Sequence, residues 1–188
     1  IAVNASIMTK LLAVTGPIEM PEYGKVISAD NFLEETQKSV ELEYDKTENK
    51  PKQFIGDLLA RVLDRVKSSS SEQMVQYLSL MANALETKEV QVSMANADED
   101  MLVQSMGWSG RIEPATGDAL AVVEANIAGQ KTNAVIEEHV THEAVISEDG
   151  SIIDSVTIKR EHTGEKGQLF HGVNNVAYMR IYVPEGSE

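Results

Sequence analysis

The chain has 188 residues, with 16 basic and 30 acidic side chains, a net charge of -14, no cysteine and a 42% hydrophobic content typical of a folded protein. This charge excludes the Lys/Arg clusters that nucleic-acid grooves and anionic membrane surfaces require, and the missing thiols exclude disulfides and Cys-ligated zinc or iron–sulfur sites. No apolar run approaches the roughly 18 residues that span a bilayer, so we expect no membrane insertion by this segment. Because of the acidic charge, we also expect no nucleic-acid partner.

The first part of the chain shows mainly helical periodicity. Apolar residues recur three and four positions apart in several windows, which end at Gly-Pro, serine-rich or polar stretches. The clearest stripe runs from Phe54 to Val66 and follows Pro51, a residue that suits the first turn of a helix. In chain order we expect a strand at 1–3, a helix over 4–15, strands at 18–20 and 25–28, helices over 32–42, 54–66 and 72–85, a strand at 90–94 and a helix over 96–104.

After Trp108 the periodicity changes from helical to alternation every second residue, which is typical of strands. Strands are expected at 119–127, 133–146, 152–162 and 176–183, and the stretch around Pro114 is the expected boundary. The sequence therefore predicts an α+β architecture, in which an N-terminal mixed α/β part at 1–112 packs on a C-terminal antiparallel, sandwich-like β part at 113–188.

Two of the expected strands flank the segment Glu148–Gly150 and suggest a hairpin. A three-residue loop would put its glycine where positive φ is required, and it would pair Glu138 with Arg160. A two-residue Asp-Gly loop would instead place Val140 opposite Lys159. Because cross-strand partners are more compatible in the first register, we predict the three-residue loop.

Histidine is the natural candidate for metal or acid–base chemistry. His139 and His142 lie three apart on one expected strand, so their side chains point to opposite faces and cannot share a metal. The expected pairing also places Lys159 opposite His139. The segment Asp45–Asn49 begins like a calcium loop, but Lys50 stands where that loop requires glycine. We therefore expect no metal site, no cofactor and no assembly of nucleophile, base and anion hole.

The segment Gly107–Arg111 resembles a nucleophile elbow, but its second glycine comes one position early, which favours an ordinary turn. Trp108 is the only tryptophan of the chain. Its indole either fills the gap between the two parts or offers a flat face to a sugar or a peptide. Trp108 and Arg111 are therefore the candidate ligand-binding residues, and no residue is assigned a catalytic role.

Four segments, taken in order and spacing, resemble a known family. They are Leu11–Ile18 (LLAVTGPI), Ser105–Gly110 (SMGWSG), Gly117–Asn126 (GDALAVVEAN) followed by Gly129 and Lys131, and Tyr178–Ser187 (YMRIYVPEGS). Together they resemble the bacterial domain-of-unknown-function family 4012 over essentially the whole chain. Its members typically carry an N-terminal membrane anchor and an extracytoplasmic domain, which begins upstream with a segment rich in Gly, Arg and Asp. The resemblance implies that this chain is the C-terminal portion of such a domain, truncated at its N-terminal side.

A more distant similarity is to the LytR-CpsA-Psr envelope transferases, which join polyprenyl-linked polymers to peptidoglycan. These enzymes share the apolar strand, the helix and the Gly-Pro-like turn, and they rely on Arg and Asp residues that come largely from the upstream half. The resemblance to family 4012, together with the absence of a catalytic constellation, leads us to expect a non-catalytic, extracytoplasmic domain of a bacterial cell-envelope protein, structural or binding, whose partner is a cell-wall glycan or an envelope protein. The alternatives are the scaffold half of such a transferase, with its active site upstream, and a carbohydrate-binding module using Trp108 with Tyr178 or Tyr182.

Overall fold

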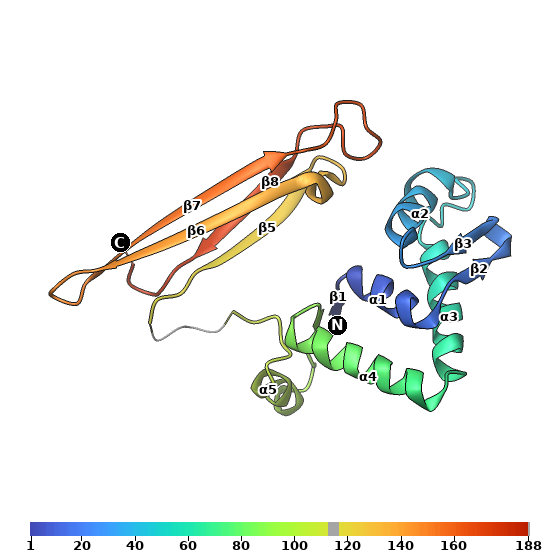
Figure 1. Ribbon diagram of the computed structural model, residues 1–188, viewed down its shortest axis with the longest axis horizontal. Helices are drawn as coiled ribbons and strands as arrows, with labels where there is room; N and C mark the ends of the chain where they lie inside the picture. Colours follow the sequence, from blue (N-terminus) through green and yellow to red (C-terminus); the bar gives the residue numbers. More distant parts are fainter. Residues whose placement is uncertain (113–116, 188) are drawn as a thin grey trace. The chain divides into compact units, whose positions relative to one another are not determined.

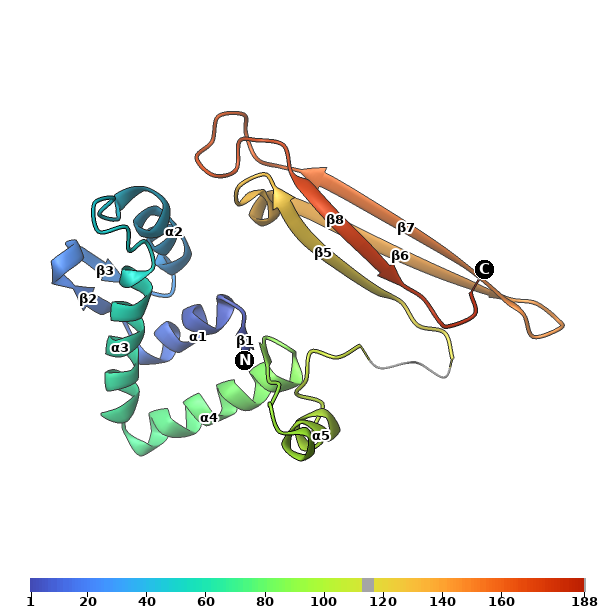
Figure 2. The same cartoon turned by 180° about the vertical axis from the view of Figure 1, so that it is seen from behind.

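A computed structural model shows an α+β protein, which confirms the predicted fold class (Figure 1). The structure describes residues 1–112 and 117–187, so Pro114, in the expected boundary, lies outside the described residues. The chain divides into two compact units, a helical unit at residues 1–112 and a β unit at residues 113–188, whose elements are also visible from behind in Figure 2. Every helix in the described part of the chain is too short or too polar to cross a bilayer.

The helical unit combines α-helices with short paired strands. Its helices are α1 (Ser6–Thr15), α2 (Phe32–Lys38) with a π-helical turn at Ser39–Glu43, α3 (Gln53–Lys67), α4 (Ser71–Glu86) and α5 (Ala97–Ser105). Its antiparallel strand pairs are β1 (Ala2–Val3) with β4 (Val90–Gln91), and β2 (Ile18–Met20) with β3 (Lys25–Ile27) across a 3₁₀ turn at Pro21–Tyr23. The strand expected at 90–94 is shorter than predicted, because the N–H of Val92 bonds the carbonyl oxygen of Trp108 instead of a strand partner.

The main apolar core lies between α3 and the β2–β3 hairpin. The predicted helix is confirmed, but its buried face is narrower than the predicted stripe, since Ile55, Leu59 and Leu63 are exposed. Phe54, Leu58 and Val62 are its buried residues, and Leu58 and Val62 are completely inaccessible to solvent. The full cluster consists of Leu12, Ile18, Met20, Ile27, Phe32, Phe54, Leu58 and Val62. Residues from two helices and one hairpin therefore close around α3, which makes this helix the centre of the helical unit.

A capping box starts α4. The Oγ of Ser70 accepts a hydrogen bond from the N–H of Gln73, and the Gln73 Oε1 accepts one from the N–H of Ser70, both at 3.2 Å. Near the other end of the helix, Ala84 packs with Ile7 and Val90 in a second, smaller cluster. This cluster holds the β1–β4 pair against the last turns of α4.

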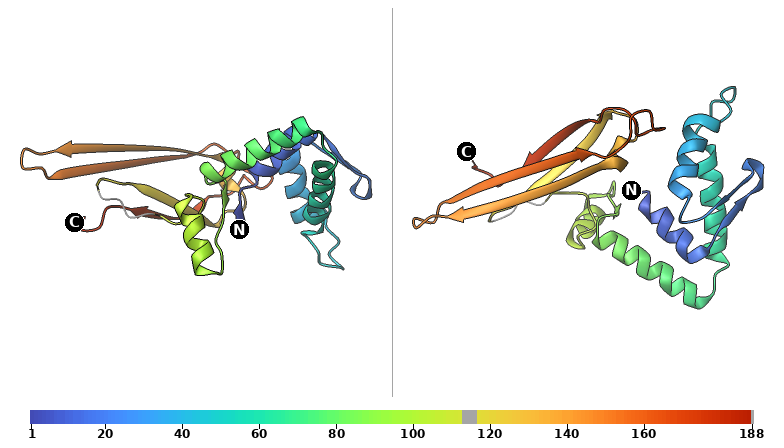
Figure 3. Two further views of the ribbon diagram at one scale, coloured as in Figure 1. Left: turned by 90° about the horizontal axis from the view of Figure 1, so that it is seen from below. Right: turned by 45° about the horizontal axis from the view of Figure 1, so that its top comes forward.

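The β unit consists of two antiparallel ribbons. In one, β5 (Ala121–Ala128) pairs with β8 (Val176–Tyr182); in the other, β6 (Ile136–Ile146) pairs with β7 (Ile152–His162). The strand expected from residue 133 begins at Ile136 because a 3₁₀ turn occupies Thr132–Val135. In the described residues each ribbon is a separate two-stranded sheet, and Figure 3 shows the two in different layers.

The predicted hairpin register is confirmed. Glu138 lies opposite Arg160, and the last strand pair, Ile146 with Ile152, is followed by a hydrogen bond of 2.8 Å from the N–H of Ser147 to the carbonyl oxygen of Ser151. The loop between these serines has three residues, and its glycine, Gly150, has φ +85°. The turn chemistry therefore sets which side chains of β6 and β7 share a face.

Burial differs sharply between the two units. Among the described residues, every buried apolar side chain belongs to the helical unit, and the one buried side chain of the β unit is that of Thr132. On β5 the less exposed positions include Glu124 and Asn126 as well as Val122, so polar groups occupy the layer that faces the other ribbon. The β unit therefore depends on strand hydrogen bonds and polar contacts more than on an apolar core.

The packing of α3 makes a first prediction. Leu58→Ala should lower the free energy of unfolding of the helical unit by about 2–5 kcal/mol, because it leaves a cavity in the main core. Its neighbour Leu59 is 41% exposed, so Leu59→Ala should change that free energy by about 0.5 kcal/mol or less. Urea unfolding followed by Trp108 fluorescence measures both, and equal losses would contradict the assigned helix face.

The hairpin loop makes a second prediction. Gly150→Ala should destabilise the β6–β7 hairpin by about 1 kcal/mol, because alanine is strained at positive φ. Gly150→Asn, which tolerates the left-handed region better, should cost less. Amide hydrogen exchange of β6 and β7 measures the loss. Faster exchange in the asparagine variant than in the alanine variant would argue against this loop conformation.

Candidate functional site

The two candidate ligand-binding residues of the sequence lie in one turn but serve different contacts. Trp108 is half-buried, and its backbone N–H donates to the carbonyl oxygen of Val103 near the end of α5. Arg111 donates from Nη1 to Oε1 of Gln104 at 3.0 Å and lines an open depression of about 560 Å³. Among the described residues that line this depression, Trp108 is absent. The turn therefore does not bring the two side chains together in one pocket.

An acidic depression of about 460 Å³ lies beside the β2–β3 hairpin. The hydroxyl of Tyr23 donates to Asp57 Oδ2 at 2.5 Å, and burial together with this carboxylate raises the pKa of Tyr23 to about 12. Lys25 forms ion pairs with Glu35 at 2.6 Å and with Glu43 at 2.7 Å, and its hydrogen bond lowers the pKa of Glu35. These groups bind one another. The charged side chains that line this depression therefore serve structural contacts around the hairpin.

The histidines of β6 separate as the strand geometry requires. His139 lies opposite Lys159, whereas His142 lies opposite Val156 on the other face of the ribbon. The prediction that these two histidines do not share a face is confirmed. The face that carries His142 also carries Arg160, which contacts Glu124 of β5, so His142 points to the layer between the ribbons.

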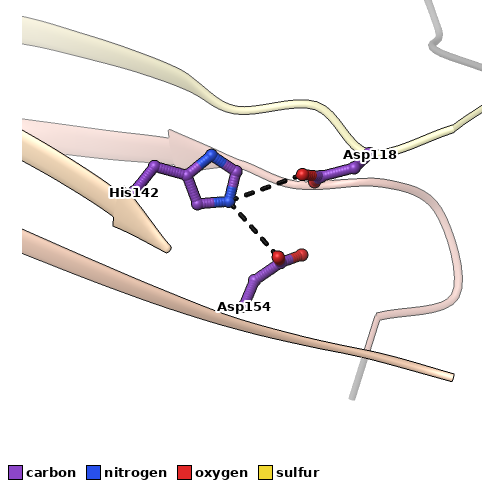
Figure 4. Close-up of side chains that lie close together, drawn as sticks. All are labelled: Asp118, His142 and Asp154. Atoms are coloured by element: carbon purple, nitrogen blue, oxygen red, sulfur yellow. Dashed lines mark ion pairs between the residues drawn. The ribbon is translucent and has the colours of Figure 1, made fainter. Parts of the chain in front are cut away.

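His142 lies close to two aspartates there, and the three side chains point toward one another (Figure 4). Its Nε2 is 3.4 Å from Oδ1 of Asp154 and 3.6 Å from Oδ2 of Asp118. Each offers one ligand atom, and these atoms all lie within 4.8 Å of one another. The side chains are 28–31% exposed, so the cluster is partly shielded but open to small solutes.

Three separate segments build this cluster. Asp118 lies just before β5, His142 lies on β6, and Asp154 lies on β7. Asp154 is opposite Ala144, which makes it a diagonal neighbour of His142 on the same face of the hairpin. The hairpin register thus brings two of the groups together, and the start of β5 supplies the third.

The charges of the cluster are unbalanced. Two carboxylates share one imidazole, and in the part of the chain that the structure describes His142 is the only ion-pair partner of either Asp118 or Asp154. Such an arrangement can bind a cation. The spacing of the histidines alone does not predict this cluster, because its other two members are aspartates from other segments. The predicted register already made Asp154 a diagonal neighbour of His142, but nothing in the sequence placed Asp118 beside them.

A second polar cluster ties the ribbons together farther along. Arg160 donates from Nη2 to Oε1 of Glu124 on β5, and its Nε lies 3.1 Å from Oε2 of Glu138 on β6. The same Nη2 lies 3.3 Å from Oδ1 of Asn175, whose Nδ2 donates to the buried hydroxyl of Thr132 at 2.9 Å. One guanidinium therefore links both strands of the hairpin to the other ribbon.

Comparison with protein-family models, curated proteins and solved structures yields no match to this chain.

The guanidinium contact makes a third prediction. Arg160→Gln should destabilise the β unit by about 1–2 kcal/mol, because Glu124 and Glu138 lose their shared cation while partly shielded from water. Lys159→Gln is the matched control: its ion pair with Glu161 is 3.6 Å long and both side chains are more than half exposed, so it should cost almost nothing. Amide exchange of β5 and β7 measures both changes. Equal effects of the two variants would contradict the contact.

Proposed function

We propose that this chain is a non-catalytic, extracytoplasmic domain of a bacterial cell-envelope protein, with a structural or binding role. The parent protein would belong to the domain-of-unknown-function family 4012 and would be anchored by an N-terminal membrane helix. The resemblance of four ordered segments motivates the proposal. The proposal concerns the location and the class of function. The partner that it implies is a cell-wall glycan or another envelope protein.

The observation that carries the non-catalytic role is the use of the charged groups in the β unit. The guanidinium of Arg160 is held between Glu124 and Glu138, so it links strands and is not available to bind a substrate anion. His142, the other candidate for proton transfer in this layer, lies between two carboxylates. A histidine that activates a serine or threonine nucleophile would lie within hydrogen-bond reach of that hydroxyl, and His142 has no such hydrogen bond among the described residues.

One motif of the resemblance also has a structural explanation. Gly129 follows β5 with φ +139°, and a Cβ at this position would lie 2.6 Å from the carbonyl oxygen of Asn174. A glycine is therefore needed so that the chain can turn close to the segment before β8. The requirement comes from the fold, as expected for a motif that preserves structure.

The scaffold half of an envelope glycopolymer transferase is the first alternative. It predicts binding of polyprenyl pyrophosphate by the full-length parent protein through arginines upstream of this chain. The non-catalytic proposal predicts no such binding.

Two measurements on the full-length parent protein test the proposal. A phosphatase that needs disulfides for activity, fused after this chain, should be active, because disulfides form only outside the reducing cytoplasm. An inactive but intact phosphatase fusion would overturn the proposed location. Separately, polyprenyl pyrophosphate should not bind the parent protein. Binding that disappears when upstream arginines are replaced would overturn the non-catalytic role.

Carbohydrate binding is a second candidate function, favoured by the outer face of β8. Tyr178, Arg180 and Tyr182 alternate along the strand, and the Arg180 guanidinium lies 5.5 Å from the Tyr178 ring centroid. The rings of Tyr178 and Tyr182 are substantially exposed, as the stacking of sugars requires. Trp108, the third aromatic residue of this hypothesis, belongs to the helical unit.

A sedimentation assay with purified cell-wall glycan tests this second candidate. The replacement of Tyr178 and Tyr182 together by alanine should reduce glycan binding at least about tenfold, whereas their replacement by phenylalanine should retain most of it, because stacking depends on the ring. Binding that is absent in the unaltered chain, or equal in both variants, would rule out this surface.

A further inference from the structure

We propose that Asp118, His142 and Asp154 bind one divalent transition-metal cation of the zinc type, with water completing the coordination. The site lies in the layer between the ribbons of the β unit, and it fastens the segment before β5 to the β6–β7 hairpin (Figure 4). The inference is independent of the proposed envelope role, because it rests only on the donor atoms and their positions.

The first observation in favour of a metal ion is the separation of the donor atoms. The Nε2 of His142 lies 3.4 Å from Asp154 and 3.6 Å from Asp118. These distances exceed the roughly 2.7–3.2 Å of a direct N–H···O hydrogen bond. A tetrahedral ion with bonds of about 2.1 Å separates its ligands by about 3.4 Å. Each carboxylate therefore lies from the imidazole at about the distance that separates two ligands of a common ion, and all three ligand atoms lie within 4.8 Å of one another.

The second observation in favour of a metal ion is the negative charge of the cluster. Asp118 and Asp154 contribute two negative charges. Even a protonated His142 would leave the cluster with one excess negative charge. A divalent cation bound to the neutral imidazole balances both carboxylates. Among the described residues no lysine or arginine is ion-paired to either aspartate, so no side chain that the structure describes already supplies this charge.

The donor set selects the metal. Calcium and magnesium prefer sites made of oxygen ligands alone, whereas imidazole nitrogen is a ligand typical of zinc and neighbouring transition metals. One nitrogen and two carboxylate oxygens leave one position of a tetrahedral ion for water. This fits a chain that has no cysteine and that therefore cannot offer thiolate.

The position of the site explains what the ion would do. Asp118 precedes the ribbon formed by β5 and β8, whereas His142 and Asp154 belong to the other ribbon. The ribbons have no shared strand pairing in the described residues, and Arg160 links them at Glu124. A metal at Asp118 would add a second link between the layers, nearer to the loop of the hairpin.

Cobalt serves as the probe, because tetrahedral Co²⁺ absorbs visible light and Zn²⁺ displaces it. Titration of the 188-residue chain should reveal one Co²⁺ per chain. His142→Ala and Asp154→Asn should each weaken binding at least about tenfold, since each removes a ligand. His139→Ala is the matched control, because this residue lies on the same strand but on the opposite face. Its affinity for Co²⁺ should be unchanged.

Amide hydrogen exchange provides a second readout that locates the ion. Saturating Zn²⁺ should slow exchange at the start of β5 and around His142 and Asp154, and Asp118→Asn should abolish the slowing at β5. Metal-free exchange of β6 and β7 in each variant shows whether the hairpin remains folded. The proposal is overturned if the chain binds no Co²⁺, if His139→Ala weakens binding as much as His142→Ala does, or if Zn²⁺ protects neither segment.

Discussion

The register of the β6–β7 hairpin is the constraint on which the β unit depends. Because side chains alternate between faces, the register decides which residues meet the other ribbon. It sets Glu138 opposite Arg160 and makes Asp154 a diagonal neighbour of His142. The ionic link between the ribbons and the candidate metal centre both follow from this pairing. Gly150, with its positive φ, allows the loop that produces it.

The two units are stabilised by different interactions. In the helical unit, α3 buries Leu58 and Val62 among residues from α1, α2 and the β2–β3 hairpin, and this packing removes apolar surface from water. In the β unit the facing layer contains Arg160 and its carboxylate partners beside apolar side chains that are only half-buried, such as Val156 and Ile158. Polar contacts of this kind contribute little net free energy, since the charges must lose part of their hydration. The second unit therefore relies more on its strand ladders.

The sequence was most informative where one local pattern determined the structure. The stripe around Leu58 predicted α3, and the loop at Glu148–Gly150 predicted the hairpin register, including the contact between Glu138 and Arg160. Contacts between segments far apart in the chain could not be predicted in this way. Arg160 also binds Glu124, and Asp118 lies beside His142, because of how the two ribbons face each other. Neither pairing has a local signature in the sequence.

The polar residues between the ribbons are best understood as determinants of alignment. If β7 slipped by two residues against β6, the faces would be retained, but Arg160 would lie opposite Ile136 or Val140 instead of Glu138. The same slip would also break the aliphatic pairs of the hairpin, because Val145 would lie opposite Ser151 or Ser155 instead of Ile153. A guanidinium opposite an aliphatic side chain would lose its carboxylate partner while still partly shielded from water, which is costly. The ionic contacts and the aliphatic pairs of the hairpin thus favour the same register.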